Sequence, residues 1–183
     1  MSTTRPILIL SGTNRPGSNA LRISKLLAAL YARVGVHVEV LSLGDLGPEI
    51  FLPSSYAAKP PEMIALQERV VNATGLHIVT PEYNGSFPGV LKYFIDLLKF
   101  PESFDHKPVA FVGEANGAWG GLRAVEQLQM VFAYRNAHLY PKRVFINAVR
   151  EKFDAQGNLN DVDLMQRLEE QCAGFAKFVG AVG

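Results

Sequence analysis

A polar stretch near the start of the chain, SGTNRPGSN, is rich in residue types that bind phosphate. It lies between an apolar run and a segment with helical periodicity. Its candidate phosphate ligands are Thr13, Arg15, Gly17 and Ser18. A helix that begins just after the stretch would add free N–H groups and the positive end of its dipole. The stretch therefore predicts an anion site; the alternative is a simple helix cap at Ser18, with Arg15 in water.

A second polar loop, PEYNGSFPG, follows another apolar run at residues 81–89. Pro81 lacks a backbone N–H and fixes the chain direction, while Asn84 and Gly85 form a turn pair that tolerates positive φ. Such a turn presents backbone N–H and C=O groups, which match the polar edge of a flat heterocycle. The alternative is an ordinary tight turn from which Phe87 enters the core.

A third loop, EANGAWGG, covers residues 114–121. Its glycines allow a backbone to approach a ligand closely, and the indole of Trp119 could stack on an aromatic ring. Trp is also enriched at protein interfaces, so packing of Trp119 against a neighbouring subunit is an equal alternative.

The segments between these loops alternate between strand and helix patterns. Strands are expected at 7–10, 36–41, 76–80, 109–113 and near 143–149, and 36–41 should lie at or near a sheet edge. Helices are expected at about 21–34, 62–73, 90–98 and 122–133, followed by a last helix with Leu164, Leu168, Cys172, Phe175 and Val179 on one face. The long connection 42–61 is expected to pack at a functional or interface surface.

This alternation predicts an α/β fold with a doubly wound parallel sheet and right-handed crossovers. Residues 1–183 are expected to form a single domain. The three polar loops follow the first, third and fourth strands. They should therefore meet beyond the carboxyl ends of the strands, where such sheets bind ligands.

Composition and missing motifs narrow the possible functions. The net charge is +1 without a basic block, and no apolar run approaches the ~20 residues of a membrane span, so neither nucleic acid nor a membrane is an expected partner. The polar stretches match neither the GxGxxG nor the GxxxxGK[ST] fingerprint. The four His residues lack metal-ligand spacing, so no metal is expected. The single cysteine, Cys172, is expected to be a buried thiol. A chain with only one cysteine suits a reducing compartment, so the protein is expected to be cytoplasmic.

The combination of SGTNRPGSN with PEYNGSFPGVLKYFIDLL resembles the NAD(P)H-dependent FMN reductases, which include quinone, azo-dye and chromate reductases. The order of elements matches along nearly the whole chain. The resemblance implies a flavodoxin-like three-layer sandwich with a five-stranded parallel sheet in the order 2-1-3-4-5. It also implies FMN as cofactor, NADPH or NADH as reductant, and no obligatory catalytic side chain.

Carried over by position, the resemblance suggests phosphate ligands in the first loop, isoalloxazine contacts in the second and a third flavin loop at 115–121. The candidate cofactor-binding residues are Ser11, Thr13, Arg15, Gly17, Ser18, Asn19, Pro81, Glu82, Tyr83, Asn84, Gly85, Asn116, Gly117 and Trp119. Two positions depart from the pattern: Ala115 stands where relatives often carry Ser or Thr, and Tyr93 where they commonly carry Asn.

The implied reaction is hydride transfer from NAD(P)H through FMN to free flavin, a quinone, an azo compound or a similar small acceptor, by a ping-pong route. The helix after the second loop contributes to a dimer interface in the family, so a homodimer or a dimer of dimers is implied. A non-enzymatic FMN-binding electron carrier or redox sensor is the alternative, and an interaction scaffold with an empty pocket is a more distant one.

Overall fold

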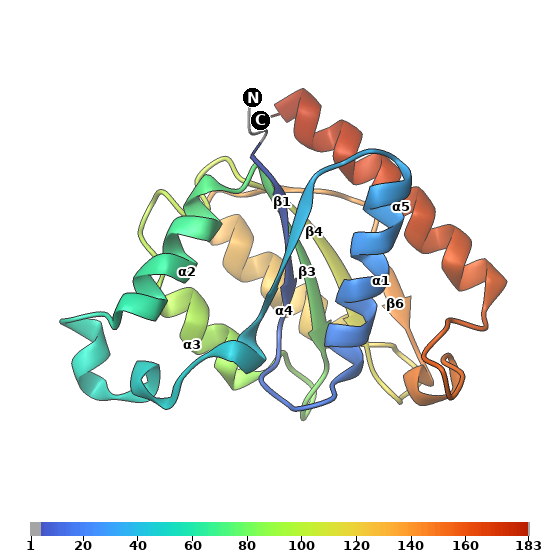
Figure 1. The fold of residues 1–183 in the computed structure, drawn as a ribbon, viewed down its shortest axis with the longest axis horizontal. Helices are drawn as coiled ribbons and strands as arrows, with labels where there is room; N and C mark the ends of the chain where they lie inside the picture. Colours follow the sequence, from blue (N-terminus) through green and yellow to red (C-terminus); the bar gives the residue numbers. More distant parts are fainter. Residues whose placement is uncertain (1–4, 183) are drawn as a thin grey trace.

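The computed structural model describes residues 5–182, in which strands and helices alternate (Figure 1). The strands are β1 (Ile7–Ser11), β2 (Val38–Ser42), β3 (Gly75–Pro81), β4 (Pro108–Glu114), β5 (His138–Leu139) and β6 (Val144–Ile146). The helices are α1 (Asn19–Arg33), α2 (Pro61–Asn72), α3 (Gly89–Leu97), α4 (Leu122–Tyr134) and α5 (Val162–Val182).

All strand pairs are parallel, and the sheet order is β2-β1-β3-β4-β5, with β6 also paired to β4. This confirms the predicted flavodoxin-like order and the edge position of β2. Two apolar clusters fill the space on either side of the sheet. One includes buried residues of α1 and α5, and the other includes buried residues of α2, α3 and α4. The result is the predicted three-layer sandwich (Figure 1).

The central strands bury side chains on both faces, as parallel strands between two helix layers must. In β1, Leu8 and Leu10 join the cluster under α2–α4, whereas Ile7 and Ile9 join the cluster under α1 and α5. Cys172 is buried in the second cluster, as predicted. These continuous apolar runs made the central strands recognisable in the sequence.

The prediction of one fifth strand near 143–149 is wrong in its extent. Two short strands take its place: β5 pairs with the first residues of β4, and β6 pairs with the last. The segment between them is two residues longer than the matching part of β4, so the pairing cannot continue in register. Pro141 lies in this segment and has no N–H to donate to a ladder.

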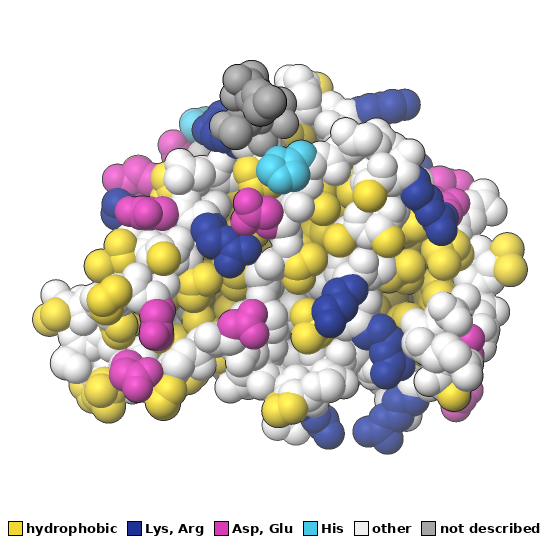
Figure 2. All heavy atoms as spheres, viewed as in Figure 1, with side chains coloured by type: hydrophobic (Ala, Val, Ile, Leu, Met, Phe, Trp, Pro, Cys, Tyr) yellow, Lys and Arg dark blue, Asp and Glu magenta, His cyan; other side chains and the backbone are white. Residues whose placement is uncertain are grey.

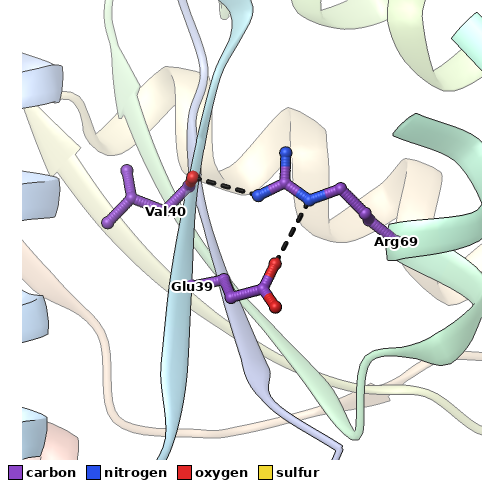
Figure 3. A network of polar contacts seen from close by, with 3 residues as sticks. All are labelled: Glu39, Val40 and Arg69. Carbon is purple, nitrogen blue, oxygen red and sulfur yellow. Dashed lines mark hydrogen bonds and ion pairs between the residues drawn. The ribbon is translucent and has the colours of Figure 1, made fainter. Parts of the chain in front are cut away.

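Arg69 on α2 protects the exposed edge of the sheet (Figure 3). Its Nη2 donates to the Val40 carbonyl at 3.1 Å, and its Nε donates to Glu39 Oε2 at 3.2 Å. The unpaired side of an edge strand otherwise offers its carbonyl groups to other chains. The guanidinium therefore connects α2 to β2, and it satisfies the Val40 carbonyl on the unpaired side of β2.

The long connection between β2 and α2 contains three short 3-10 helices: η1 (Leu43–Asp45), η2 (Pro48–Phe51) and η3 (Pro53–Tyr56). Tyr93 on α3 anchors this segment. Its hydroxyl donates to the Ile50 carbonyl at 2.7 Å, and its ring lies 5.2 Å from that of Phe51 and 5.9 Å from that of Tyr56. The residue that departs from the family pattern thus has a structural role of its own.

Residues 1–4 and 183 of the predicted single domain lie outside the described part of the chain, and the single domain stays a prediction. Between residues 5 and 182, no helix is long and apolar enough to span a membrane. Nor does this part of the chain bring together three or more His, Cys, Asp or Glu side chains that could hold a metal ion.

Candidate functional site

A cavity of about 430 Å³ opens at the carboxyl edge of the sheet. The loops after β1, β3 and β4 converge at this edge, at the bottom of Figure 1. The lining residues are Arg15, Pro16, Gly17, Ser18, Asn19, Pro81, Glu82, Tyr83, Glu114, Ala115, Asn116, Val149 and Arg150. The three polar loops of the sequence therefore form one site, at the place expected for a doubly wound sheet.

The start of α1 forms one wall of the cavity. Ser18 is the N-cap of α1, and its Oγ accepts from the Leu21 N–H at 3.2 Å. Within the described chain, the N–H groups of Asn19 and Ala20 have no acceptor, because the first turn of a helix has no preceding carbonyls. Together with the cation of Arg15, they give this wall a positive potential.

Thr13 joins two of the loops. Its Oγ1 lies 3.2 Å from the Tyr83 hydroxyl and accepts from the Arg15 N–H at 3.3 Å. Thr13 is buried and is not among the lining residues. Its hydroxyl therefore sets the position of Arg15 and Tyr83 at the cavity wall.

The second loop is a tight hairpin turn. Asn84 and Gly85 have φ of 52° and 76°, as their sequence predicted, and Tyr83 and Ser86 form a two-residue antiparallel bridge around them. Gln127 on α4 donates to the Gly85 carbonyl at 3.0 Å and accepts from the Ser86 hydroxyl at 2.6 Å. Phe87 packs against the core and anchors the turn on that side.

Two glycines hold the third loop against the sheet. Gly120 and Gly121 have φ of 57° and 88°, and a Cβ on Gly121 would lie 2.6 Å from the Glu114 nitrogen. Such a contact leaves no room for any larger residue. Trp119 beside them is 66% exposed and lies outside the cavity lining. The Trp119 indole is therefore not packed in the core. Stacking on an aromatic ring and packing against a neighbouring subunit both stay predictions.

Most of the sequence-predicted residues come together. Those that line the cavity are Arg15, Gly17, Ser18, Asn19, Pro81, Glu82, Tyr83 and Asn116. Those that lie outside the lining are Ser11, Thr13, Asn84, Gly85, Gly117 and Trp119. Ser11 is buried at the end of β1, where its hydroxyl has no hydrogen-bond partner in the described chain.

Five residues line the cavity that were not among the candidate site residues: Pro16, Glu114, Ala115, Val149 and Arg150. Glu114 is the last residue of β4, and burial raises the pKa of its carboxyl to about 7, an effect that the nearby Arg15 charge partly offsets. A carboxyl at the end of an apolar strand was the available signal for Glu114. Arg150 lies in a short 3-10 helix, η4 (Val149–Glu151), which no motif marked.

The donors and acceptors of the cavity suit a flavin mononucleotide. The α1 wall and Arg15 match a phosphate dianion. Glu82 Oε2 is buried without a hydrogen-bond partner in the described chain, which leaves an acceptor for an N–H or hydroxyl group of a ligand. The residues present therefore fit FMN at both its phosphate and its polar groups.

Comparison with known proteins agrees with this chemistry. The family model described as NADPH-dependent FMN reductase matches residues 6–151. The chain belongs to this family. It is 31% identical to an NAD(P)H-dependent FMN reductase of Pseudomonas aeruginosa over 93% of both chains. It is also 30% identical to a quinone reductase of Escherichia coli, over 100% of this chain and 99% of the relative.

The fold has solved counterparts in the same structural class. The structure of FerB, a flavoenzyme NAD(P)H:(acceptor) oxidoreductase from Paracoccus denitrificans, superposes with a TM-score of 0.82, at 24% identity, over 98% of this chain and 100% of that one. Family membership confirms the predicted oxidoreductase class, with FMN as cofactor and a nicotinamide coenzyme as reductant.

Proposed function

We propose that this NADPH-dependent FMN reductase family member transfers reducing equivalents from NADPH or NADH to a quinone or a similar small acceptor. One observation carries the proposal: the Arg15 side chain and the N-terminus of α1 at Ser18 line the same cavity as Pro81, Glu82 and Tyr83. Two relatives are named for quinone chemistry: the quinone reductase of Escherichia coli and a 2-hydroxy-1,4-benzoquinone reductase of Burkholderia sp., which is 33% identical over 74% of this chain.

The residues of the chain bind and orient in this proposal. Arg15 and the free N–H groups of α1 hold the phosphate, while Pro81, Glu82 and Tyr83 form the wall for the ring system. Bound FMN supplies the hydride chemistry, so no protein acid or base is required. The protein contributes orientation and electrostatic stabilisation. If reductant and acceptor use the same open side of the cavity in turn, the kinetics are ping-pong.

A homodimer, or a dimer of dimers, is part of the proposal. Apolar side chains gather over the segment that Figure 1 draws in teal, at the lower left of Figure 2. We call this the η2–η3 surface; its exposed members are Phe51, Leu52 and Tyr56. Its rings pack on Tyr93 of α3, so the surface continues onto the helix that contributes to the dimer interface in the family. Exposed apolar patches of this kind support association.

The decisive test is anaerobic stopped-flow mixing of the FMN-loaded protein with NADPH or NADH. Rapid bleaching of the flavin absorbance, followed by reoxidation on mixing with a benzoquinone, is the expected result. Bound FMN that neither coenzyme bleaches would favour an electron carrier or redox sensor. A purified protein that is colourless and does not take up FMN would contradict both functions.

A further inference from the structure

Glu114 occupies a fixed place on the α1 side of the sheet. Its strand neighbours of the same parity, Ala110 and Val112, pack in the cluster under α1 and α5, so the Glu114 side chain leaves the strand on that face. Its carbonyl accepts from the Glu82 N–H at 3.0 Å. The Gly121 backbone lies close to its nitrogen, since a Cβ on Gly121 would be 2.6 Å from that atom. The backbone on both sides of the carboxyl is therefore constrained.

The Glu114 side chain is enclosed by the cavity that would take the phosphate. Only 5% of Glu114 is exposed, yet it lines the same cavity as Arg15 and the start of α1. Burial removes water from around a negative charge there and raises the pKa of the carboxyl, and the nearby Arg15 charge offsets this effect only in part. A neutral carboxyl is consequently the favoured form until the pH exceeds about 7.

The charges that line the cavity with this carboxyl come from three other segments. Arg15 lies on the loop after β1, Glu82 follows β3, and Arg150 lies in η4. Tyr83 lines the same cavity. No charged side chain of α4 or α5 is among the described lining residues. With both carboxyls ionised, they balance the two guanidinium groups. With Glu114 neutral, the cavity carries one excess positive charge.

We propose that Glu114 is a cofactor-binding residue that carries a proton when FMN is bound, so that binding of the FMN phosphate is coupled to uptake of that proton. The inference rests on the proposed flavin function of this cavity. A phosphate dianion beside Arg15 is repelled by an ionised Glu114 and not by a neutral one. Because the bound state favours the protonated carboxyl, the affinity for FMN falls as the pH rises.

The test is a titration of the flavin-free protein with FMN between pH 7 and 9, in which the quenching of FMN fluorescence measures binding. The phosphate is already a dianion in this range, since its second pKa is about 6. For the native protein, Kd should rise with pH, by up to about tenfold per pH unit. Glu114→Gln should bind FMN with a Kd that is flat over the same range and lower than the native Kd at pH 9.

Two controls make the assignment specific. Glu82→Gln makes the same chemical change at the other carboxyl of the cavity and should keep the pH slope. Riboflavin lacks the phosphate and should show a smaller slope in the native protein. Calorimetry at pH 8 in two buffers of different ionisation enthalpy should detect proton uptake with the native protein and none with Glu114→Gln.

Two results would overturn the inference while leaving the flavin function intact: a native Kd that is constant from pH 7 to 9, or a slope that survives in Glu114→Gln. Failure of the native protein to bind FMN at every pH is a different outcome, because it would contradict the proposed function as well. Binding of FMN by Glu114→Gln shows in the same experiment that the variant is folded.

Discussion

The hydroxyl of Tyr31 on α1 lies 2.8 Å from Nδ1 of His77 on β3. On the other side of the ring, His77 Nε2 lies 3.2 Å from Oε1 of Gln171 on α5. The imidazole is completely buried, and this burial lowers the pKa of His77 to about 4. His77 is therefore a neutral hydrogen-bonding link between both helices of one layer and the central strand.

This link predicts that the contribution of His77 to stability is lost in acid. The unfolded chain binds a proton to His77 near pH 6.5, whereas the folded protein resists protonation until about pH 4. The contribution of His77 to stability is therefore fully present above pH 6.5 and falls by about 3 kcal/mol as the pH drops to 4. The measurement is the difference in unfolding free energy, by urea titration, between the native protein and His77→Gln at several pH values.

The comparison with a variant is necessary because Glu114 acts in the opposite direction. Its pKa is raised from 4.5 to about 7, so its contribution to stability is present below pH 4.5 and is lost as the pH rises through 7. The native curve should thus be flat between pH 4.5 and 6.5. In His77→Gln the unfolding free energy should fall as the pH rises from 4.5 to 6.5, because only the Glu114 contribution remains. In Glu114→Gln it should rise over the same range, because only the His77 contribution remains. A pH-independent difference between native protein and His77→Gln would contradict the role of His77.

The third loop should tolerate change at one glycine and not at another. Gly121→Ala places a Cβ 2.6 Å from the Glu114 nitrogen at a φ of 88°, and should cost on the order of 3 kcal/mol of stability. Gly117→Ala is the matched control, because its Cβ would meet nothing within 4 Å. Its unfolding free energy should stay within about 0.5 kcal/mol of the native value. Equal losses in both variants would show that the loop is not held at Gly121.

The local features of the site were readable from the sequence because each depends on a few adjacent residues. The Asn84-Gly85 turn needs only two residues that tolerate positive φ, and both adopt it. The Ser18 cap needs a hydroxyl one position before a helix, and it forms. Continuous apolar runs likewise identified the central strands, and alternation with helices then predicted the shared edge.

Features that depend on contacts between distant segments were not readable. Glu114 lines a cavity together with residues of the first two loops and of η4, which lie elsewhere in the sequence. The contact of Thr13 with Tyr83, 70 residues away, is another such feature, and the role of Thr13 in phosphate binding stays a prediction. The split of the last strand likewise arises from a register difference against β4, which no local pattern reveals.

Arg15 should be the main cationic contact for the FMN phosphate. Arg15→Ala removes a charge-assisted hydrogen bond at the α1 wall and should weaken FMN binding by about 1 to 3 kcal/mol. Arg33→Ala is the control: it removes the same charge at the far end of α1, where Arg33 pairs with Glu169 at 3.0 Å on the surface. FMN affinity, measured by fluorescence quenching at pH 7, should be unchanged in Arg33→Ala. An Arg15→Ala variant with native affinity would remove Arg15 from the site.

The η2–η3 surface should carry the proposed association between copies of the chain. Leu52 and Tyr56 are 53% and 57% exposed, so Leu52→Ser with Tyr56→Ser should leave the fold intact and remove apolar area from that surface alone. Sedimentation velocity should show a dimer or tetramer for the native protein and a shift toward monomer for this double variant. Val34→Ser with Val162→Ser also removes two exposed apolar side chains, at 52% and 81%, and should leave the sedimentation unchanged. A native protein that sediments as a monomer, or a double variant that assembles like the native protein, would show that this surface does not join subunits.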